Sequence, residues 1–160
     1  MRPVRTVLAV ASLGALVAGT AHAAPASVTG GGFHRDGKGR TATKSMLTIE
    51  GHPATSTGRA NHKVDGPGKA RSAVHITLSC VVVNGNTAYA SGKDATGKEW
   101  FVKVVDNGEP GRADQYGVSA NGETVMGVPV PAQLSSTCRA GQVATRAITG
   151  GGNFQVRPAS

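Results

Sequence analysis

The segment Ala73-Val-His-Ile-Thr-Leu-Ser-Cys-Val-Val-Val83 decides the fold class of this chain. Apolar side chains alternate along it and share one face of an extended strand: Val74, Ile76, Leu78, Cys80 and Val82. A period of two residues over about ten positions is typical of a half-buried β-strand. The dipeptide Asn84-Gly85 follows, and it favours a tight hairpin turn because both of its positions accept positive φ. We therefore expect an antiparallel hairpin at this point.

Other short runs of the same kind are separated by Gly, Asn, Asp and Pro, and none has the period of a long amphipathic helix. We expect further strands at Ser27–Phe33, Thr43–Glu50, Thr87–Ser91, Glu99–Asp106, Gln115–Ala120, Gln142–Thr149 and Asn153–Arg157. In the run from Glu99, one face carries Trp100, Val102 and Val104, so the only tryptophan should anchor the core. About eight strands predict a single antiparallel all-β domain, a β-sandwich as first choice and a β-barrel as second.

Residues 51–70 are less regular, with many Gly, Ala, Thr, Lys and His residues. We predict a mobile or weakly paired basic surface segment there, in which His62-Lys63-Val64 forms at most a short edge strand.

Residues 1–23 have the features of a signal peptide: Arg2 and Arg5, the apolar run Val7–Ala18, and the cleavage pattern Ala21-His22-Ala23. The apolar run is shorter than the roughly 20 residues of a membrane span, and no second such run follows. Residues 24–160 are then expected to form one secreted, extracellular domain without a membrane span, whose formal charge falls from +8 to +6 after cleavage.

The chain contains two cysteines, Cys80 and Cys138. Because an exported chain meets an oxidising environment, we predict a disulfide between them that staples the apolar side of the strand carrying Cys80. A closed loop of about 58 residues corresponds to roughly 4 kcal/mol in the chain-entropy model. Two free buried thiols are the alternative.

The segment Asp106-Asn107-Gly108-Glu109-Pro110-Gly111-Arg112-Ala113-Asp114 forms an acidic turn after a strand. We interpret it as structural: Asn-Gly supplies positive φ, Pro110 fixes the bend, and the two aspartates cap backbone amides. A calcium site is the alternative, but the spacing differs from a twelve-residue calcium loop. We predict no metal site, and no change in melting temperature with calcium.

Two glycine triplets, Gly30–Gly32 and Gly150–Gly152, lie near the two ends of the expected domain. Neither precedes a lysine-serine pair or a helix, so a nucleotide loop is not indicated. Glycines in strands mark close backbone approach, and we predict that the first and last strands are adjacent there.

The histidines His34, His52, His62 and His75 have no metal-ligand spacing, and we interpret them as scattered and solvent-facing. Serine, histidine and aspartate are present without a Gly-x-Ser-x-Gly motif, so no catalytic residues are predicted. No cofactor is predicted either.

Several motifs together resemble a family: the Gly-Gly-Gly start, a Val83–Gly92 hairpin, the run Phe101–Gly111 with Asp114, and the end segment Ile148–Val156. The chain resembles a largely uncharacterised group of small secreted bacterial β-domains, found alone or attached to cell-surface proteins. The resemblance covers nearly all of residues 24–160 and implies a fold and an extracellular setting, with no catalytic residues. The first half departs from it, with fewer aromatic and more basic residues.

Charge is concentrated in that first half, since His34–His75 has eight Lys or Arg residues against three acids. One interpretation of such a segment is a solvated basic surface without a partner. As a binding surface it favours anionic partners, although it lacks the interleaved aromatics that stack on nucleic-acid bases. We therefore expect a non-catalytic module that associates with the cell surface, its unknown partner being an anionic cell-wall polymer or a surface protein rather than nucleic acid. A small secreted enzyme or enzyme inhibitor is the alternative.

Overall fold

A computed structural model describes residues 24–37, 42–67, 69–108, 114–120, 124–125, 128–129, 138, 143–149 and 151–160. The expected signal peptide at 1–23 lies outside these residues. The strands are β1 (Ser27–Asp36), β2 (Thr43–His52), β3 (Thr57–Gly66), β4 (Lys69–Asn84), β5 (Thr87–Lys93), β6 (Glu99–Val105), β7 (Gln115–Ala120), β8 (Thr124–Val125), β9 (Val128–Pro129), β10 (Arg146–Ala147) and β11 (Gly152–Arg157). One 3-10 turn, Pro53–Thr55, joins β2 to β3.

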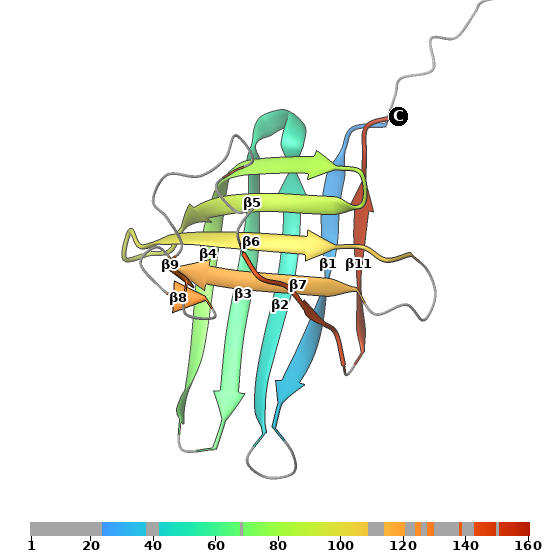
Figure 1. Ribbon diagram of the computed structural model, residues 1–160. Coiled ribbons are helices and arrows are strands. Elements are labelled where there is room, and N and C mark those ends of the chain that lie inside the picture. The colour runs from blue at the N-terminus through green and yellow to red at the C-terminus, as the bar shows by residue number, and fades with distance from the viewer. Residues whose placement is uncertain are drawn as a thin grey trace, which may run out of the picture.

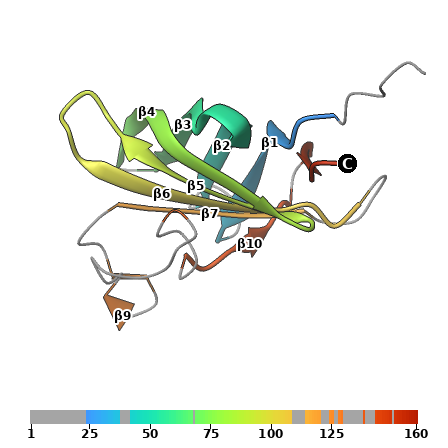
Figure 2. The same cartoon turned by 90° about the horizontal axis from the view of Figure 1, so that it is seen from above.

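Nine of these strands form one antiparallel sheet in the order β10-β7-β6-β5-β4-β3-β2-β1-β11, and β8 pairs only with β9. The sheet curls into a half-barrel. In Figure 1, β5, β6 and β7 cross in front of β1–β4 and β11, and Figure 2 shows the same two layers from above. The prediction of an antiparallel all-β domain of the barrel or sandwich type is confirmed, and all nine strands belong to a single continuous sheet.

The core lies inside the curl, between the inner faces of the two layers. Its largest fully buried side chains come from both layers and include Tyr116, Phe154, Leu47, Ile76, Val28, Val102 and Val104. Trp100 is 9% exposed and belongs to the same cluster, as its alternation with Val102 and Val104 predicted.

Strand β4 belongs to both layers, and a β-bulge marks the change between them. Leu78 pairs with Gly92 but Cys80 pairs with Ser91, so Ser79 is the extra residue. A bulge reverses the side-chain alternation after it. The core residues of β4 are therefore Ile76 and Leu78 before the bulge and Val81 after it. The predicted placement of Cys80 on the apolar core face is wrong for this reason.

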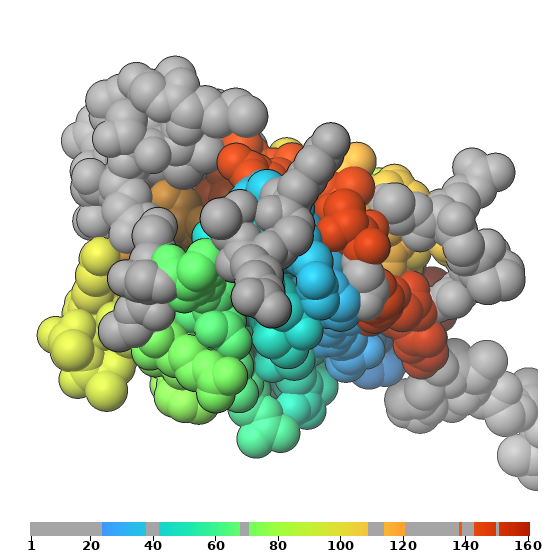
Figure 3. All heavy atoms as spheres, turned by 90° about the horizontal axis from the view of Figure 1, so that it is seen from below, coloured from blue at the N-terminus to red at the C-terminus, as the bar shows by residue number. Residues whose placement is uncertain are grey.

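The prediction of a weakly paired segment at 51–70 is also wrong. Residues Thr57–Gly66 form β3, which pairs with β2 along one edge and with β4 along the other. His62-Lys63-Val64 is thus in an interior strand of the sheet, not at an edge. Figure 3 shows β4 and β3 (green), β2 (cyan), β1 (blue) and β11 (red) as neighbouring bands.

Candidate functional site

The two aspartates of the acidic turn link the open edge of the sheet to the end of β6. Strand β11 pairs with β1 on one side only. On its other side, Phe154 N–H donates to Asp114 Oδ2 at 2.8 Å and Val156 N–H donates to Asp106 Oδ2 at 3.0 Å. The remaining carboxylate oxygens accept Asn107 N–H at 2.9 Å and Gly108 N–H at 2.8 Å.

Each of these four carboxylate oxygens therefore accepts a backbone N–H, as the structural interpretation of the turn predicted. Glu109, Pro110 and Gly111, which that interpretation also included, lie outside the described residues.

Glycines of both triplets meet at the contact between β1 and β11, and Gly150 lies outside the described residues. Gly31 is opposite Asn153 and Gly32 is opposite Gly152, so the predicted adjacency of the first and last strands is present. A Cβ on Gly30 would lie 2.2 Å from Asn153 O, and one on Gly152 would lie 2.3 Å from Gly31 O. These positions require glycine because the two backbones approach too closely for any side chain.

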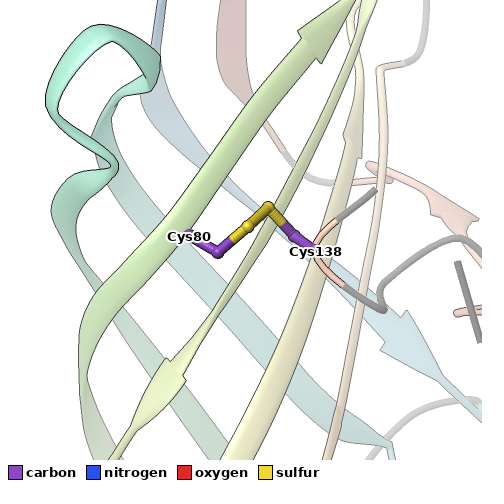
Figure 4. Close-up of a disulfide and its surroundings, with 2 residues drawn as sticks. All are labelled: Cys80 and Cys138. Atoms are coloured by element: carbon purple, nitrogen blue, oxygen red, sulfur yellow. A yellow bond between two sulfur atoms is a disulfide. The ribbon is translucent and has the colours of Figure 1, made fainter. Parts of the chain in front are cut away.

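The predicted cysteine pair is bonded, with a Cα–Cα distance of 5.5 Å (Figure 4). Because of the bulge, Cys80 projects from the outer side of the sheet, in the row that continues through Ser91 to Phe101. Phe101 is fully buried there and packs with Val143 in a second, smaller cluster. The disulfide thus holds Cys138 against the outer side of β4–β6, which is not part of the main core.

A polar cluster lies on the inner face, where the two layers meet. Tyr116 O–H donates to the backbone carbonyl of Ser45 at 2.6 Å, and Ser45 Oγ lies 3.0 Å from His62 Nε2. The Tyr116 ring also lies 5.1 Å from the ring of His34, centre to centre. Burial raises the pKa of Tyr116 and lowers the pKa of His34. His34 and His62 are therefore inward-facing, and the prediction that all four histidines face solvent is wrong for these two.

The outer face of β1–β4 carries charged side chains from all four strands. Five cations from the basic first half alternate with core residues and so project from this one face: Arg35, Lys44, Arg59, Lys63 and Arg71. Two carboxylates share it, and each has an arginine partner. Arg59 Nη2 lies 2.8 Å from Glu50 Oε2, and Arg71 Nε lies 3.3 Å from Asp65 Oδ2. The hydrogen bond from Arg59 is the main reason why the pKa of Glu50 is lowered.

The remaining cations, Arg35, Lys44 and Lys63, form a group that we call the cationic strip. Arg35 in β1 is directly opposite Lys44 in β2. Lys63 in β3 is opposite Met46 in β2, and Met46 is in turn opposite Phe33 in β1. Lys44 Nζ lies 4.0 Å and Arg35 Cζ lies 5.8 Å from the centre of the Phe33 ring. Like charges opposite each other on a sheet destabilise it. Among the described residues, no carboxylate neutralises the strip's charge of +3, and the strip lies next to the half-buried ring of Phe33.

A row of uncharged hydrogen-bonding groups, the polar row, lies beside the cationic strip. It consists of Thr48, Asn61 and His75, which are in register across β2, β3 and β4. Asn61 Nδ2 donates to Thr48 Oγ1 at 3.3 Å, and Asn61 Oδ1 is hydrogen-bonded to His75 Nδ1.

Two adjoining hollows of about 190 Å³ each open over this row. Thr48, Ile49, Glu50, Arg59 and Asn61 line the first, and Met46, Thr48, Asn61, Lys63 and His75 line the second. The strip and the polar row thus meet in the second hollow.

Among the described residues, no group of three or more His, Cys, Asp or Glu side chains could hold a metal ion. The same part of the chain contains no helix that is long and apolar enough to cross a membrane. Comparison with models of protein families, with curated proteins and with solved structures finds no match.

Proposed function

We propose that this chain is a non-catalytic extracellular module that binds anionic polymers on the outer face of β1–β4. The observation that carries the proposal is the position of Arg35, Lys44, Arg59, Lys63 and Arg71, which all lie on this one face. Among the described side chains, only two carboxylates share it. A polyanion would neutralise the cationic strip and relieve the repulsion between Arg35 and Lys44.

The arrangement of the two layers supports the same proposal. The outer side of β5–β6 is occupied, because Phe101 is fully buried against Val143. On β1–β4, by contrast, Arg35, Arg59, Lys63 and His75 are exposed. An anionic cell-wall polymer has the complementary charge, and the resemblance to secreted surface-associated β-domains is compatible with such a partner.

Catalysis is the weaker proposal. The hydrogen bond between Ser45 and His62 is the kind of contact that activates a serine nucleophile. Ser45 is only 9% exposed, however, and its hydroxyl also lies 3.2 Å from Tyr116 Oη inside the core. We therefore favour binding over an enzyme.

The test measures the affinity of the protein for polygalacturonate and for inorganic polyphosphate by titration calorimetry at several salt concentrations. The variant Arg35→Gln/Lys44→Gln/Lys63→Gln should lose about tenfold or more in affinity at low salt, because three phosphate- or carboxylate-facing charges are removed. The wild-type affinity should fall steeply as salt rises.

The matched control is Lys93→Gln/Lys103→Gln/Arg157→Gln, which removes the same charge from β5, β6 and β11. It should retain most of the affinity. Equal losses in the two variants, or no binding of either polymer at low salt, would contradict the proposal.

A further inference from the structure

We infer that the polymer bound by the outer face of β1–β4 is an anionic polysaccharide. Its sugar hydroxyls form hydrogen bonds with the polar row of Thr48, Asn61 and His75. This inference rests on the proposed function and adds the chemical class of the ligand. The hydrogen bonds within the row determine what each side chain can still offer to a ligand.

The row presents both donors and acceptors. Thr48 Oγ1 accepts the amide N–H of Asn61, so its own O–H can donate to a ligand. Asn61 Oδ1 is a carbonyl oxygen and can only accept, so the His75 Nδ1 facing it bears the proton. In the neutral ring, His75 Nε2 is then an acceptor directed away from Asn61.

This combination selects between classes of polyanion. A sugar hydroxyl both donates and accepts, so it can satisfy the Thr48 hydroxyl and His75 Nε2 in the same site. The ionised oxygens of a polyphosphate only accept, so they leave His75 Nε2 unpaired. A site built to hydrogen-bond hydroxyl groups discriminates against ligands that lack them, because its polar groups are desolvated without a partner.

The shape of the surface fits a chain of linked rings rather than a single small molecule. The two hollows share Thr48 and Asn61 and so continue one another along the strands. Together they reach the lower end of the range of about 300–1,000 Å³ that is typical of small-molecule sites. Met46 supplies an apolar wall for the C–H side of a ring, and Lys63 beside it supplies a cation for a carboxylate.

The experiment compares the protein with the variants Thr48→Val and Asn61→Ala, using polygalacturonate and inorganic polyphosphate as probes in calorimetry at low salt. Each variant should bind polygalacturonate about fivefold or more weakly, the effect of losing one or two hydrogen bonds. Binding of polyphosphate should change less than twofold. The matched control Thr29→Val removes a hydroxyl from the outer face of β1, outside both hollows, and should leave both affinities unchanged.

The outcomes separate this inference from the proposed function. If neither probe binds, the proposed function fails and the inference fails with it. If both bind but Thr48→Val and Asn61→Ala weaken the two equally or not at all, the face binds charge alone and the inference is overturned. Circular dichroism and Trp100 fluorescence of each variant establish that it is folded before binding is measured.

Discussion

The carboxylate of Asp114 accepts the backbone N–H of Phe154, 40 residues further along the chain, at 2.8 Å. Both residues are buried, Asp114 at 2% exposure and Phe154 at 0%. The bond lies on the side of β11 that has no neighbouring strand. A side chain therefore supplies the hydrogen bond that a tenth strand would otherwise provide, and the last strand of the sheet is held against the end of β6.

The substitution Asp114→Ala should lower the free energy of unfolding by about 2–4 kcal/mol, because it leaves the Phe154 and Asn107 N–H groups without their charged acceptor. Urea denaturation followed by circular dichroism measures this change. The control Asp65→Ala removes an exposed ion pair with Arg71 and should cost less than about 1 kcal/mol. Similar losses in the two variants would contradict the linking role of Asp114.

The substitution Gly152→Ala should be more destabilising than Gly97→Ala, although both glycines have positive φ, 126° and 84°. At Gly152 a Cβ would meet the backbone of β1, whereas at Gly97 it meets nothing within 4 Å. We expect losses of about 2 kcal/mol or more and about 1 kcal/mol, respectively. Thermal unfolding of the two variants checks the order, and equal melting temperatures would show that β1 and β11 are not in close contact.

Asp94 should make stability depend on acid pH. The Thr96 hydroxyl, followed by Trp100 Nε1 at 2.9 Å, lowers the pKa of Asp94 from 3.8 to about 2. Because the folded pKa lies below the unfolded one, the ionised carboxylate stabilises the fold above about pH 4, and this contribution is lost as the pH falls through 2.

In Asp94→Asn, which does not titrate, the loss of stability between pH 4 and pH 2 should be smaller than in the wild type. Urea denaturation at several pH values, with Trp100 fluorescence as the probe, measures both slopes. Identical slopes would mean that Asp94 is not the responsible group.

The double variant Cys80→Ser/Cys138→Ser should lose up to about 4 kcal/mol of stability, the chain-entropy value for a separation of 58 residues. Its structural effect should be local. Side-chain NMR signals of Phe101 and Val143, beside the disulfide, should shift, whereas those of Leu47 and Ile76 in the main core should not. Equal shifts in the two clusters would place the disulfide in the main core instead.

The alternation of apolar and polar residues predicted the strands whose two faces differ strongly in hydropathy. The predicted Gln115–Ala120 coincides with β7, and the predicted start of β5 at Thr87 is correct. The bulge at Ser79 could not be predicted in this way. Val81, Val82 and Val83 are all apolar, so either alternation is compatible with the sequence after Leu78, and only the pairing with β5 decides between them.

Strand β3 was missed because its inward-facing residues are small or polar. Ala60, at 0% exposure, fills its core position with only a methyl group, and the inward neighbours are Gly58 and His62. The inward face of β3 therefore differs little in hydropathy from the outward face, which carries Arg59, Asn61 and Lys63. The period of two residues is nevertheless present.

The candidate site was predicted only in part. The charge of the first half indicated an anionic partner. The number of Lys and Arg residues could not show, however, whether they are scattered over the surface or lie together on one face. That distinction depends on the register of β1, β2 and β3, which places Arg35 opposite Lys44 and Phe33 opposite Met46. The polar row depends on the same register, because Thr48 and Asn61 are 13 residues apart in the chain.

The most direct test of the proposed function is an NMR titration of the isotope-labelled protein with polygalacturonate at low salt. We expect the shifted signals to belong to β1–β4, with the largest shifts for the side chains of Lys44, Asn61 and Lys63, and we expect added salt to reverse them. Shifts confined to β5–β7, or none while the polymer is shown to bind, would contradict the assignment of this face.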